Sequence, residues 1–352
     1  MAYSSIIDPT AYFQTVIYTG NATARSITFD GNSDMQPDWI WGKQRSGTDS
    51  HQLTDVVRGV TKILNSDTTA AENTTSAAIT AFNSDGFSLG TGGGYNGNNV
   101  TQVAWNWKAG TSFTNDASGT GIGSVDSTGS VNQDAGFSIM SWTGTGANAT
   151  VAHGLGATPK MMIFKVRDGA TAWVVYHKNV GPTKGLFLNT TGTGSTVSAY
   201  FQDTNPTSSV FSVGSDADTN GSSKSMITYC FAEKQGYSKF GSYEGNSNTN
   251  GTFVYLGFKP AWLMVKPIDA VDNWVMFDNK RLGFNSSTSP FNFAGANNAN
   301  AETSDTGQLD LLSNGFKIRN SGGTVNKSST YIYMAFAENP FVASNYNVAT
   351  AR

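Results

Sequence analysis

The run DADTNG, from Asp216 to Gly221, comes closest to a metal-binding pattern in this sequence. Asp216, Asp218 and Asn220 occupy alternate positions, as the first three ligands of a calcium-binding loop do. The twelfth position of such a loop requires a bidentate glutamate, but Ile227 stands there. The run is therefore an incomplete calcium candidate. We interpret it as a polar loop tip that holds neither a metal nor another cofactor.

A pair of carboxylates is the second chemistry to consider, because glycoside hydrolysis needs two of them on either side of one bond. Glu233 and Glu338 occupy matching places in the phrases FAEK and FAEN. They belong to different repeats of the chain, so they would flank one bond only if those repeats faced each other. We interpret both glutamates as structural residues.

The three histidines and the cysteine give no better candidate for catalysis. His51 lies at a repeat position that Trp173 and Trp274 occupy elsewhere, which favours a packing role over base catalysis. His153 stands in a turn, and nothing near it marks a nucleophile. Cys230 lies within an apolar run, which is typical of a buried thiol. From these residues we predict that the protein is not an enzyme.

The elements that must position these residues repeat three times along the chain. The heptads PDWIWGK, PKMMIFK and PAWLMVK begin at Pro37, Pro159 and Pro260, and each closes with a lysine. Proline is tolerated at the first residue of a strand, where no ladder donor is lost. The heptad is therefore predicted to be a core strand of a repeated β unit.

A second set of residues confirms the repeat by its spacing. Phe87, Phe211 and Phe316 each precede another aromatic residue by 20 positions, at Trp107, Phe231 and Phe336. The segments between them are rich in Gly, Asn and Ser, which suit turns with positive φ. We predict three hairpins from this pattern, with tips around Tyr95, Asp216 and Gly322.

Short runs of aromatic and β-branched residues, separated by Gly, Asn, Ser and Asp, predict an all-β protein. Their spacing of about 8–12 residues indicates β-sandwiches of the jelly-roll type. We divide the chain into three tandem sandwich domains at 1–110, which includes an N-terminal arm, 131–236 and 237–352. Residues 111–130 are rich in Gly, Ser and Thr and form either a linker or the first strand of the second domain. The segment 68–82 fits a short helix or a surface loop equally well.

Composition excludes several kinds of partner. The net charge is −3 and charged residues make up 13% of the chain, so we expect no basic surface for nucleic acid or for an anionic membrane. No apolar run is long enough for membrane insertion, and the N-terminus lacks a signal pattern. A single cysteine cannot form an internal disulfide. We expect a protein that folds in a cytoplasm.

Aromatic residues, 12% of the chain, are the remaining functional signal. Most of them should fill cores, but a ring at an exposed loop tip can stack on a sugar. Tyr95 is the clearest candidate, and packing of Tyr95 on a neighbouring domain is the alternative. The predicted ligand-binding residues are the loop residues Tyr95, Asn96, Asp216, Asp218 and Asn220.

Several long phrases resemble one family of bacteriophage proteins. They are MAYSSIIDPTAYFQTVIYTGN, GFSIMSWTGTGANATVAHGLGATPKMMIFK, YCFAEKQGYSKFGSYEGN and YIYMAFAENPFV. The family is common in marine tailed phages and is described as virion or tail-fibre-like proteins. The resemblance covers essentially the whole chain and implies lectin-like, concanavalin-type sandwich domains. It supplies no catalytic residue and leaves the position on the virion open.

Residues and resemblance together predict a bacteriophage virion structural protein, folded in the host cytoplasm and displayed on the virion surface. The leading hypothesis is a tail fibre or surface appendage whose loops contact host-surface glycans. The alternative is a capsid decoration, head-fibre or collar protein with a purely structural role. The expected partners are other virion proteins, and a homo-oligomer is expected, a trimer by analogy with phage fibres.

Overall fold

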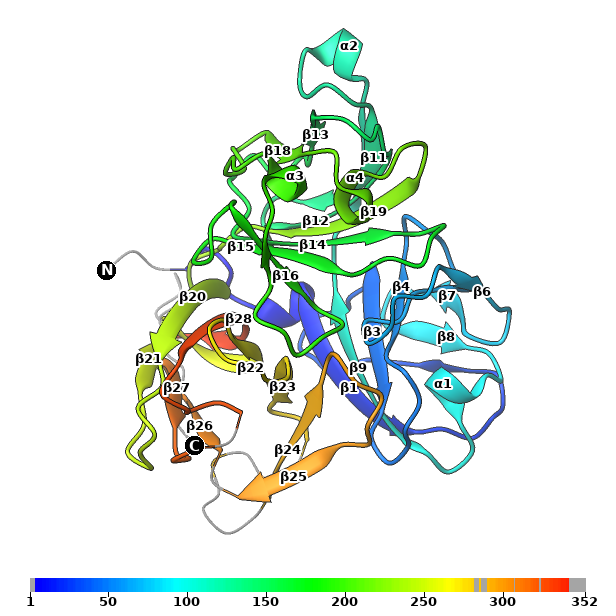
Figure 1. Ribbon diagram of the computed structural model, residues 1–352. Helices are drawn as coiled ribbons and strands as arrows, with labels where there is room; N and C mark the ends of the chain where they lie inside the picture. The colour runs from blue at the N-terminus through cyan, green and yellow to red at the C-terminus, as the bar shows by residue number, and fades with distance from the viewer. Residues whose placement is uncertain (1–3, 282–284, 286–289, 307, 323, 342–352) are drawn as a thin grey trace.

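The computed structural model describes residues 4–281, 285, 290–306, 308–322 and 324–341. Antiparallel strands form almost all of the regular structure in these ranges, and the helices are single turns. This confirms the predicted all-β class. In Figure 1 the strands gather into three groups, which we call unit one (blue to cyan), unit two (green) and unit three (yellow to red). None of the helices described is long and apolar enough to cross a membrane.

The bounds of the elements are as follows. Unit one contains η1 (Pro9–Ala11), β1 (Phe13–Thr19), β2 (Arg25–Ile27), β3 (Trp39–Gln44), β4 (Gln52–Asp55), β5 (Lys62–Ile63), β6 (Asn73–Thr74), β7 (Ile79–Phe82), β8 (Phe87–Leu89), α1 (Gly93–Asn96) and β9 (Thr101–Trp107). Unit two contains β10 (Thr111–Asn115), α2 (Ala117–Thr120), β11 (Ser127–Asn132), β12 (Phe137–Thr143), β13 (Ala149–Ala152), β14 (Met161–Val166), β15 (Val174–His177), β16 (Lys184–Phe187), β17 (Ser195–Thr196), α3 (Ser198–Phe201), β18 (Val210–Val213), α4 (Ala217–Asn220) and β19 (Ser225–Phe231). Unit three contains β20 (Ser238–Glu244), β21 (Phe253–Tyr255), β22 (Phe258–Pro267), β23 (Val275–Asp278), β24 (Pro290–Gly295), β25 (Thr303–Thr306), β26 (Leu309–Leu312), β27 (Gly315–Ile318) and β28 (Thr330–Pro340).

Each unit has a larger sheet with the same strand order. An early strand, which is β1, β12 or β20, pairs with the last strand of the unit; the last strand pairs with the heptad strand, and the heptad strand pairs with the strand that follows it. The orders are β1-β9-β3-β4, β12-β19-β14-β15 and β20-β28-β22-β23. Units two and three extend this core with further strands at the sheet edges. The sequence repeat is therefore a repeat of topology.

A smaller sheet covers the outer face of each larger sheet, namely β2-β8-β7, β13-β18 and β21-β27-β26. In unit one, Ile40 of β3 shares an apolar cluster with Phe87 of β8. In unit two, the rings of Phe164 and Phe211 pack across the two sheets with centroids 5.4 Å apart. The units are thus sandwiches, each closed by aromatic and aliphatic contacts between its two sheets.

The inner faces of the three larger sheets meet in one shared core. The ring of Phe336 lies 5.6 Å from Trp107 and 6.0 Å from Phe231, so the last strands of all three units converge there. Trp39 of β3 stacks on Tyr229 of unit two with centroids 4.4 Å apart. All six residues of β3 are buried because one face lies in its own sandwich and the other lies in the shared core. The shared core, and not only the chain connections, joins the units.

The predicted hairpins are wrong. β8 pairs with β2 and β7 in the outer sheet, whereas β9 pairs with β1 and β3 in the inner sheet. The same separation holds for β18 and β19, and for β27 and β28. Each connection therefore crosses between the sheets of a sandwich. Two apolar strands joined by a Gly-rich segment have the same local pattern in a hairpin and in such a crossing.

The Gly/Ser/Thr-rich segment 111–130 is folded and is not a linker. β10 pairs with β11, and β11 pairs with β12, so the segment forms one edge of the larger sheet of unit two. Its polar composition fits this edge position, where one side of the strand is exposed. The segment 68–82 contains no helix but the short strands β6 and β7 and the turns between them.

Candidate functional site

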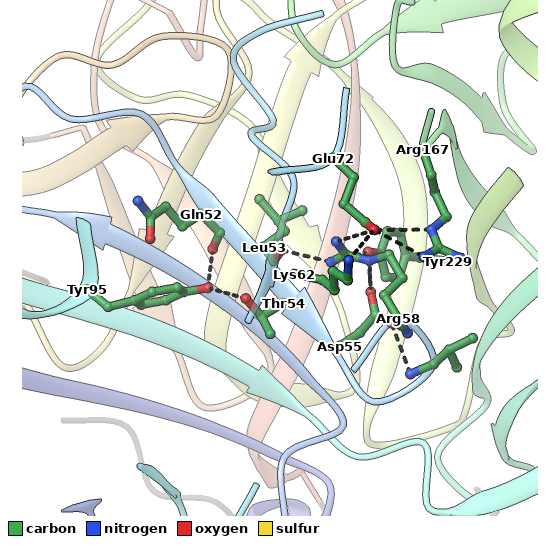
Figure 2. Close-up of polar contacts among 11 residues, drawn as sticks. Gln52, Leu53, Thr54, Asp55, Arg58, Lys62, Glu72, Tyr95, Arg167 and Tyr229 are labelled. Atoms are coloured by element: carbon green, nitrogen blue, oxygen red, sulfur yellow. Dashed lines mark hydrogen bonds and ion pairs between the residues drawn. The ribbon is translucent and has the colours of Figure 1, made fainter. Parts of the chain in front are cut away.

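Tyr95, predicted to be an exposed sugar-stacking ring, is buried in unit one with 1% of its surface exposed. Its hydroxyl group donates to the carbonyl oxygen of Gln52 at 2.8 Å and lies 3.2 Å from Thr54 Oγ1, as Figure 2 shows. A Cβ atom on Gly42 would lie 2.3 Å from the Tyr95 ring, so the ring fills the space that this glycine leaves. Tyr95 packs within its own unit and does not reach solvent.

Asn96 and Asn220 are also buried, and each holds a turn instead of a ligand. Asn96 Nδ2 donates to the carbonyl oxygens of Thr23 and Gly90, both at 2.8 Å. Asn220 Nδ2 donates to the carbonyl oxygens of Ala147 and Gly214 in the equivalent places of unit two. These amides are fully committed, so neither residue can bind an external ligand without losing its turn.

Asp216 and Asp218 make backbone hydrogen bonds around α4, and the amide of Asn220, the third residue of the calcium candidate, is used in its own turn. Asp216 caps α4 by accepting from the backbone N–H of Asp218 at 2.8 Å. Asp218 Oδ1 accepts from the backbone N–H of Ala172 at 3.3 Å, and burial raises the pKa of its carboxyl group. Within the described residues, no three acidic, histidine or cysteine side chains gather closely enough to hold a metal ion. At Gly322, the third predicted tip, an added Cβ atom would meet open space.

The histidines are buried and neutral. Burial lowers the pKa of His51 and of His177 to about 3, and that of His153 to about 4. Nδ1 of His51 accepts from Trp41 Nε1 at 2.9 Å, so its Nε2 carries the proton and donates to the carbonyl oxygen of Gly295 at 2.9 Å. Cys230 is fully buried, and burial raises the pKa of its thiol.

A buried polar network joins units one and two (Figure 2). Arg58 pairs with Asp55 at 2.5 Å and with Glu72 at 3.3 Å. Glu72 also pairs with Arg167 of unit two at 3.0 Å, and the hydroxyl group of Tyr229 donates to Asp55 at 2.8 Å. Every charge in this network has a partner of opposite sign, which is what a buried ion pair needs to be tolerated. The network therefore holds two units together.

The junction of units three and one repeats this network. Arg281 pairs with Asp278 at 2.7 Å and with Glu302 at 3.4 Å. Glu302 pairs in turn with Arg45 of unit one at 2.9 Å, and Trp105 Nε1 donates to Asp278 at 3.0 Å.

The junction of units two and three has a simpler set of polar contacts. His177 stands at the register position of the two aspartates, and its Nε2 lies 3.2 Å from the carbonyl oxygen of Tyr333. Lys184 of unit two donates to the carbonyl oxygen of Ile268 in unit three at 3.2 Å.

The residue eight positions after each heptad lysine makes a hydrogen bond to another unit, and these three contacts close the units into a ring. Trp173 Nε1 of unit two donates to the carbonyl oxygen of Asn65 in unit one at 2.9 Å. Trp274 Nε1 of unit three donates to the carbonyl oxygen of Phe187 in unit two at 2.8 Å. His51, at the same position of unit one, makes the third such contact with Gly295 of unit three. The recurring residue therefore holds each unit against the one before it in the ring. For His51, this contact takes the place of the catalytic role considered from the sequence.

A cleft opens at each junction, where the last strand of one unit ends beside the first strand of the next. We call these clefts 1/2, 2/3 and 3/1 after the units that form them; their volumes are about 750, 470 and 370 Å³. The residue five positions before the heptad proline lines each cleft, and it is Gly154, Tyr255 and Asn32, respectively. Glu233 lines cleft 2/3 and Glu338 lines cleft 3/1, so the two carboxylates do not face one bond. Each is instead ion-paired, with Lys178 and Lys259 at 3.1 Å.

Cleft 2/3 differs from the other two because it adjoins exposed aromatic rings. Phe253 and Tyr255 of β21 keep 43% and 48% of their surfaces exposed. Lys239 of β20 donates to the carbonyl oxygen of Tyr255 at 2.8 Å, and its Nζ lies 5.3 Å from the centre of the Tyr255 ring. An exposed ring beside a cation in a concave surface is suited to bind a ligand that is partly apolar and partly polar.

Sequence reasoning missed Phe253, Tyr255 and Lys239. The run FVYLGF, which begins at Phe253, has the pattern of an ordinary strand, and three apolar residues in a row give no indication of which of them faces solvent. Comparison of the repeats could have identified Tyr255. It lies five residues before the heptad proline, where the other two units have Asn32 and Gly154 instead of an aromatic residue.

The comparison with known families now places the chain. It matches, over residues 8–340, the family described as "Domain of unknown function (DUF7483)". The match covers most of the chain and spans all three units, so the protein belongs to this family. No curated protein and no solved structure matches the chain.

Proposed function

We propose that this protein is a structural protein of a bacteriophage particle, displayed on the virion surface as a tail fibre or similar appendage, and that it contacts glycans of the host surface. The observation that carries the glycan contact is the pair of exposed rings, Phe253 and Tyr255, beside cleft 2/3. The proposed contact therefore lies in a junction cleft and not at the loop tips around Tyr95 and Asp216. The resemblance of the sequence to phage virion proteins supports the particle setting.

The physical basis of this proposal is the chemistry of sugar recognition. The faces of aromatic rings carry partial negative charge and attract the C–H groups on one side of a sugar ring. Such rings bury a large area at low conformational cost, because they have two side-chain torsions. A rigid scaffold that holds them outward is an advantage, and the shared core and polar junctions of the ring of units provide one.

A glycan array probed with the purified full chain tests this function. We expect binding to a subset of surface glycans, and we expect the protein to compete with phage particles for adsorption to host cells. The double variant F253A/Y255A should lose both effects. The matched control I122A/V271A removes exposed apolar side chains elsewhere, since Ile122 and Val271 are 42% and 66% exposed, and should keep both. An absence of glycan binding by the unmodified chain at high concentration would remove the proposal.

The alternative function is a capsid decoration, head-fibre or collar subunit that binds only other virion proteins. The observation that favours it is the ring itself, in which one chain arranges three equivalent units around a common core. A chain built this way suits a threefold position of a particle without forming the homotrimer expected above. Reconstruction of an intact particle, with a count of copies, distinguishes the two functions: threefold sites on the head favour decoration, and a distal position on the tail favours adhesion.

A further inference from the structure

We infer that cleft 2/3 and the outer face of β21 form a binding site for an acidic saccharide, in which the sugar ring stacks on Tyr255 and a carboxylate or sulfate group meets Lys239. This inference rests on the proposed glycan contact and names its place and the chemical class of its ligand.

The aromatic part of the site is the outer face of an edge strand. β21 pairs with β27 on one side and ends the sheet on the other. Phe253 and Tyr255 point outward, whereas Val254 between them is buried. Residues two apart on a strand lie roughly 7 Å from each other, so the two rings form a strip that leads to the cleft. A strip of this kind can stack consecutive sugars of a chain.

The cationic part of the site is Lys239. Its ammonium group carries three N–H donors, and the contact at 2.8 Å with the Tyr255 carbonyl oxygen uses one of them. The group lines the cleft, which leaves its other donors available to an anionic group bound there. Burial is the main cause of a lowered pKa for Lys239, so an incoming anion would stabilise its charged form.

The acid in the cleft does not cancel this charge. Glu233 is the acidic residue among the described lining residues, and it is already paired with Lys178 at 3.1 Å. Glu233 also accepts from the backbone N–H of Phe240 at 3.3 Å. Because the carboxylate of Glu233 is paired with Lys178, the positive charge of Lys239 is available to an anionic ligand. The site should therefore bind an acidic sugar more tightly than a neutral one.

The other two clefts lack this combination at the same repeat positions. Asn32 and Gly154 stand where unit three has Tyr255. Gln14 and Ser138 stand where unit three has Lys239, each four residues before an aromatic residue that recurs in β1, β12 and β20, namely Tyr18, Trp142 and Tyr243. Gln14 is already committed, since its amide donates to Thr10 and accepts from Gly31. At these two repeat positions, the ring and the cation coincide in cleft 2/3 alone, whereas cleft 1/2 has its rings, Tyr12 and Phe113, and its cation, Lys108, at other positions.

Titration calorimetry with three trisaccharides tests the inference: galacturonate trimer, sulfated galactose trimer and neutral galactose trimer. We expect the two acidic trimers to bind at least about tenfold more tightly than the neutral one, with affinity that falls as salt is added. Lys239→Met keeps the apolar stem and should reduce the acidic affinities to the neutral level. Lys239→Arg should keep them, and Tyr255→Ala should weaken all three ligands.

The control variant is Lys224→Met, which removes an exposed lysine of unit two that does not line the cleft. It should bind all ligands as the unmodified protein does, and thermal unfolding of each variant checks that it is folded. Binding of one acidic trimer but not the other supports the inference and identifies the anionic group. Equal affinity for neutral and acidic trimers, unchanged in Lys239→Met, overturns the inference and leaves the proposed glycan contact standing. Binding of no glycan, on the array or by calorimetry, overturns both.

Discussion

Three buried asparagines hold the same turn in the three units. Asn96, Asn220 and Asn326 each donate to the carbonyl oxygen of the residue six positions earlier. The side-chain oxygen of each also accepts from the backbone N–H of the residue that follows a recurring glycine, which is Gly20, Gly144 or Gly245, directly after β1, β12 or β20. The glycine is required because a Cβ on Gly144 would lie 2.1 Å from the carbonyl oxygen of Gly221. Asn96 and Asn220, which the sequence predicted to bind a ligand, thus stabilise a turn that recurs in every unit.

Replacement of one such asparagine should be costly. Asn220→Ala removes the donors to the carbonyl oxygens of Ala147 and Gly214 and the acceptor for Thr145 N–H. We expect a loss of about 2–4 kcal/mol in the free energy of unfolding, because buried polar groups are left unsatisfied. Urea unfolding measures this loss. The exposed control Asn250→Ala should change stability by less than about 0.5 kcal/mol; an equal effect of the two variants would contradict the fastening role.

The buried histidines should make stability depend on pH. Burial lowers the pKa of His51 and His177 to about 3 in the folded protein, against 6.5 for an ordinary histidine. Below pH 6.5 the unfolded chain binds protons that the folded chain does not, so stability is fully present above pH 6.5 and decreases as pH falls toward the folded pKa. Each histidine contributes a slope of up to about 1.4 kcal/mol per pH unit.

Unfolding in urea at pH 7 and at pH 5 measures this slope. We expect a lower free energy of unfolding at pH 5, and a shallower dependence in His51→Gln, which keeps a donor for the Gly295 carbonyl oxygen. The comparison stops at pH 5 because carboxylates titrate below it. Equal stability at the two pH values would show that the histidines bind protons in the folded state.

At the scale of elements, the sequence predicts what is local and misses what depends on distant partners. The heptad strand β3 could be predicted because Pro37 and Lys43 recur with the same spacing and because its apolar residues exclude a solvated loop. The assignment of β8 to an outer sheet could not be predicted, because its partner β2 lies far away in the chain and leaves no mark near Phe87. Burial of Tyr95, which lies in α1, likewise depends on Gly42 in the distant strand β3.

The candidate site was harder to predict than the fold for a related reason. Tyr255 and Val254 are both apolar and adjacent, yet Tyr255 is exposed and Val254 is buried, because successive side chains of β21 point to opposite faces of the sheet and one of these faces is covered. Which face is covered is a property of the assembled sandwich. Differences between repeats carry the missing signal, since a position that is Asn32, Gly154 and Tyr255 in the three units cannot serve one common packing role.

At the scale of the whole molecule, the shared core predicts that the three units unfold together. Trp39, Phe231 and Phe336 belong to one apolar cluster, and polar contacts join each pair of units, including Arg45 to Glu302 between units one and three. A unit that unfolded alone would expose the aromatic core and break the ion pairs that cross its junctions, Glu72 with Arg167 or Glu302 with Arg45. We therefore expect one cooperative thermal transition.

Differential scanning calorimetry measures this cooperativity through the van't Hoff enthalpy. If all 352 residues unfold as one unit, that enthalpy is about 250 kcal/mol near 60 °C, at roughly 0.7 kcal/mol per residue, and it equals the calorimetric enthalpy. Independent units would each give about 80 kcal/mol, with a calorimetric total about three times larger. Arg281→Met, which leaves Asp278 unpaired at the junction of units three and one, should lower the transition temperature of the whole molecule without splitting the transition. A second transition in that variant would show that unit three unfolds independently and that the ring is a set of separable domains.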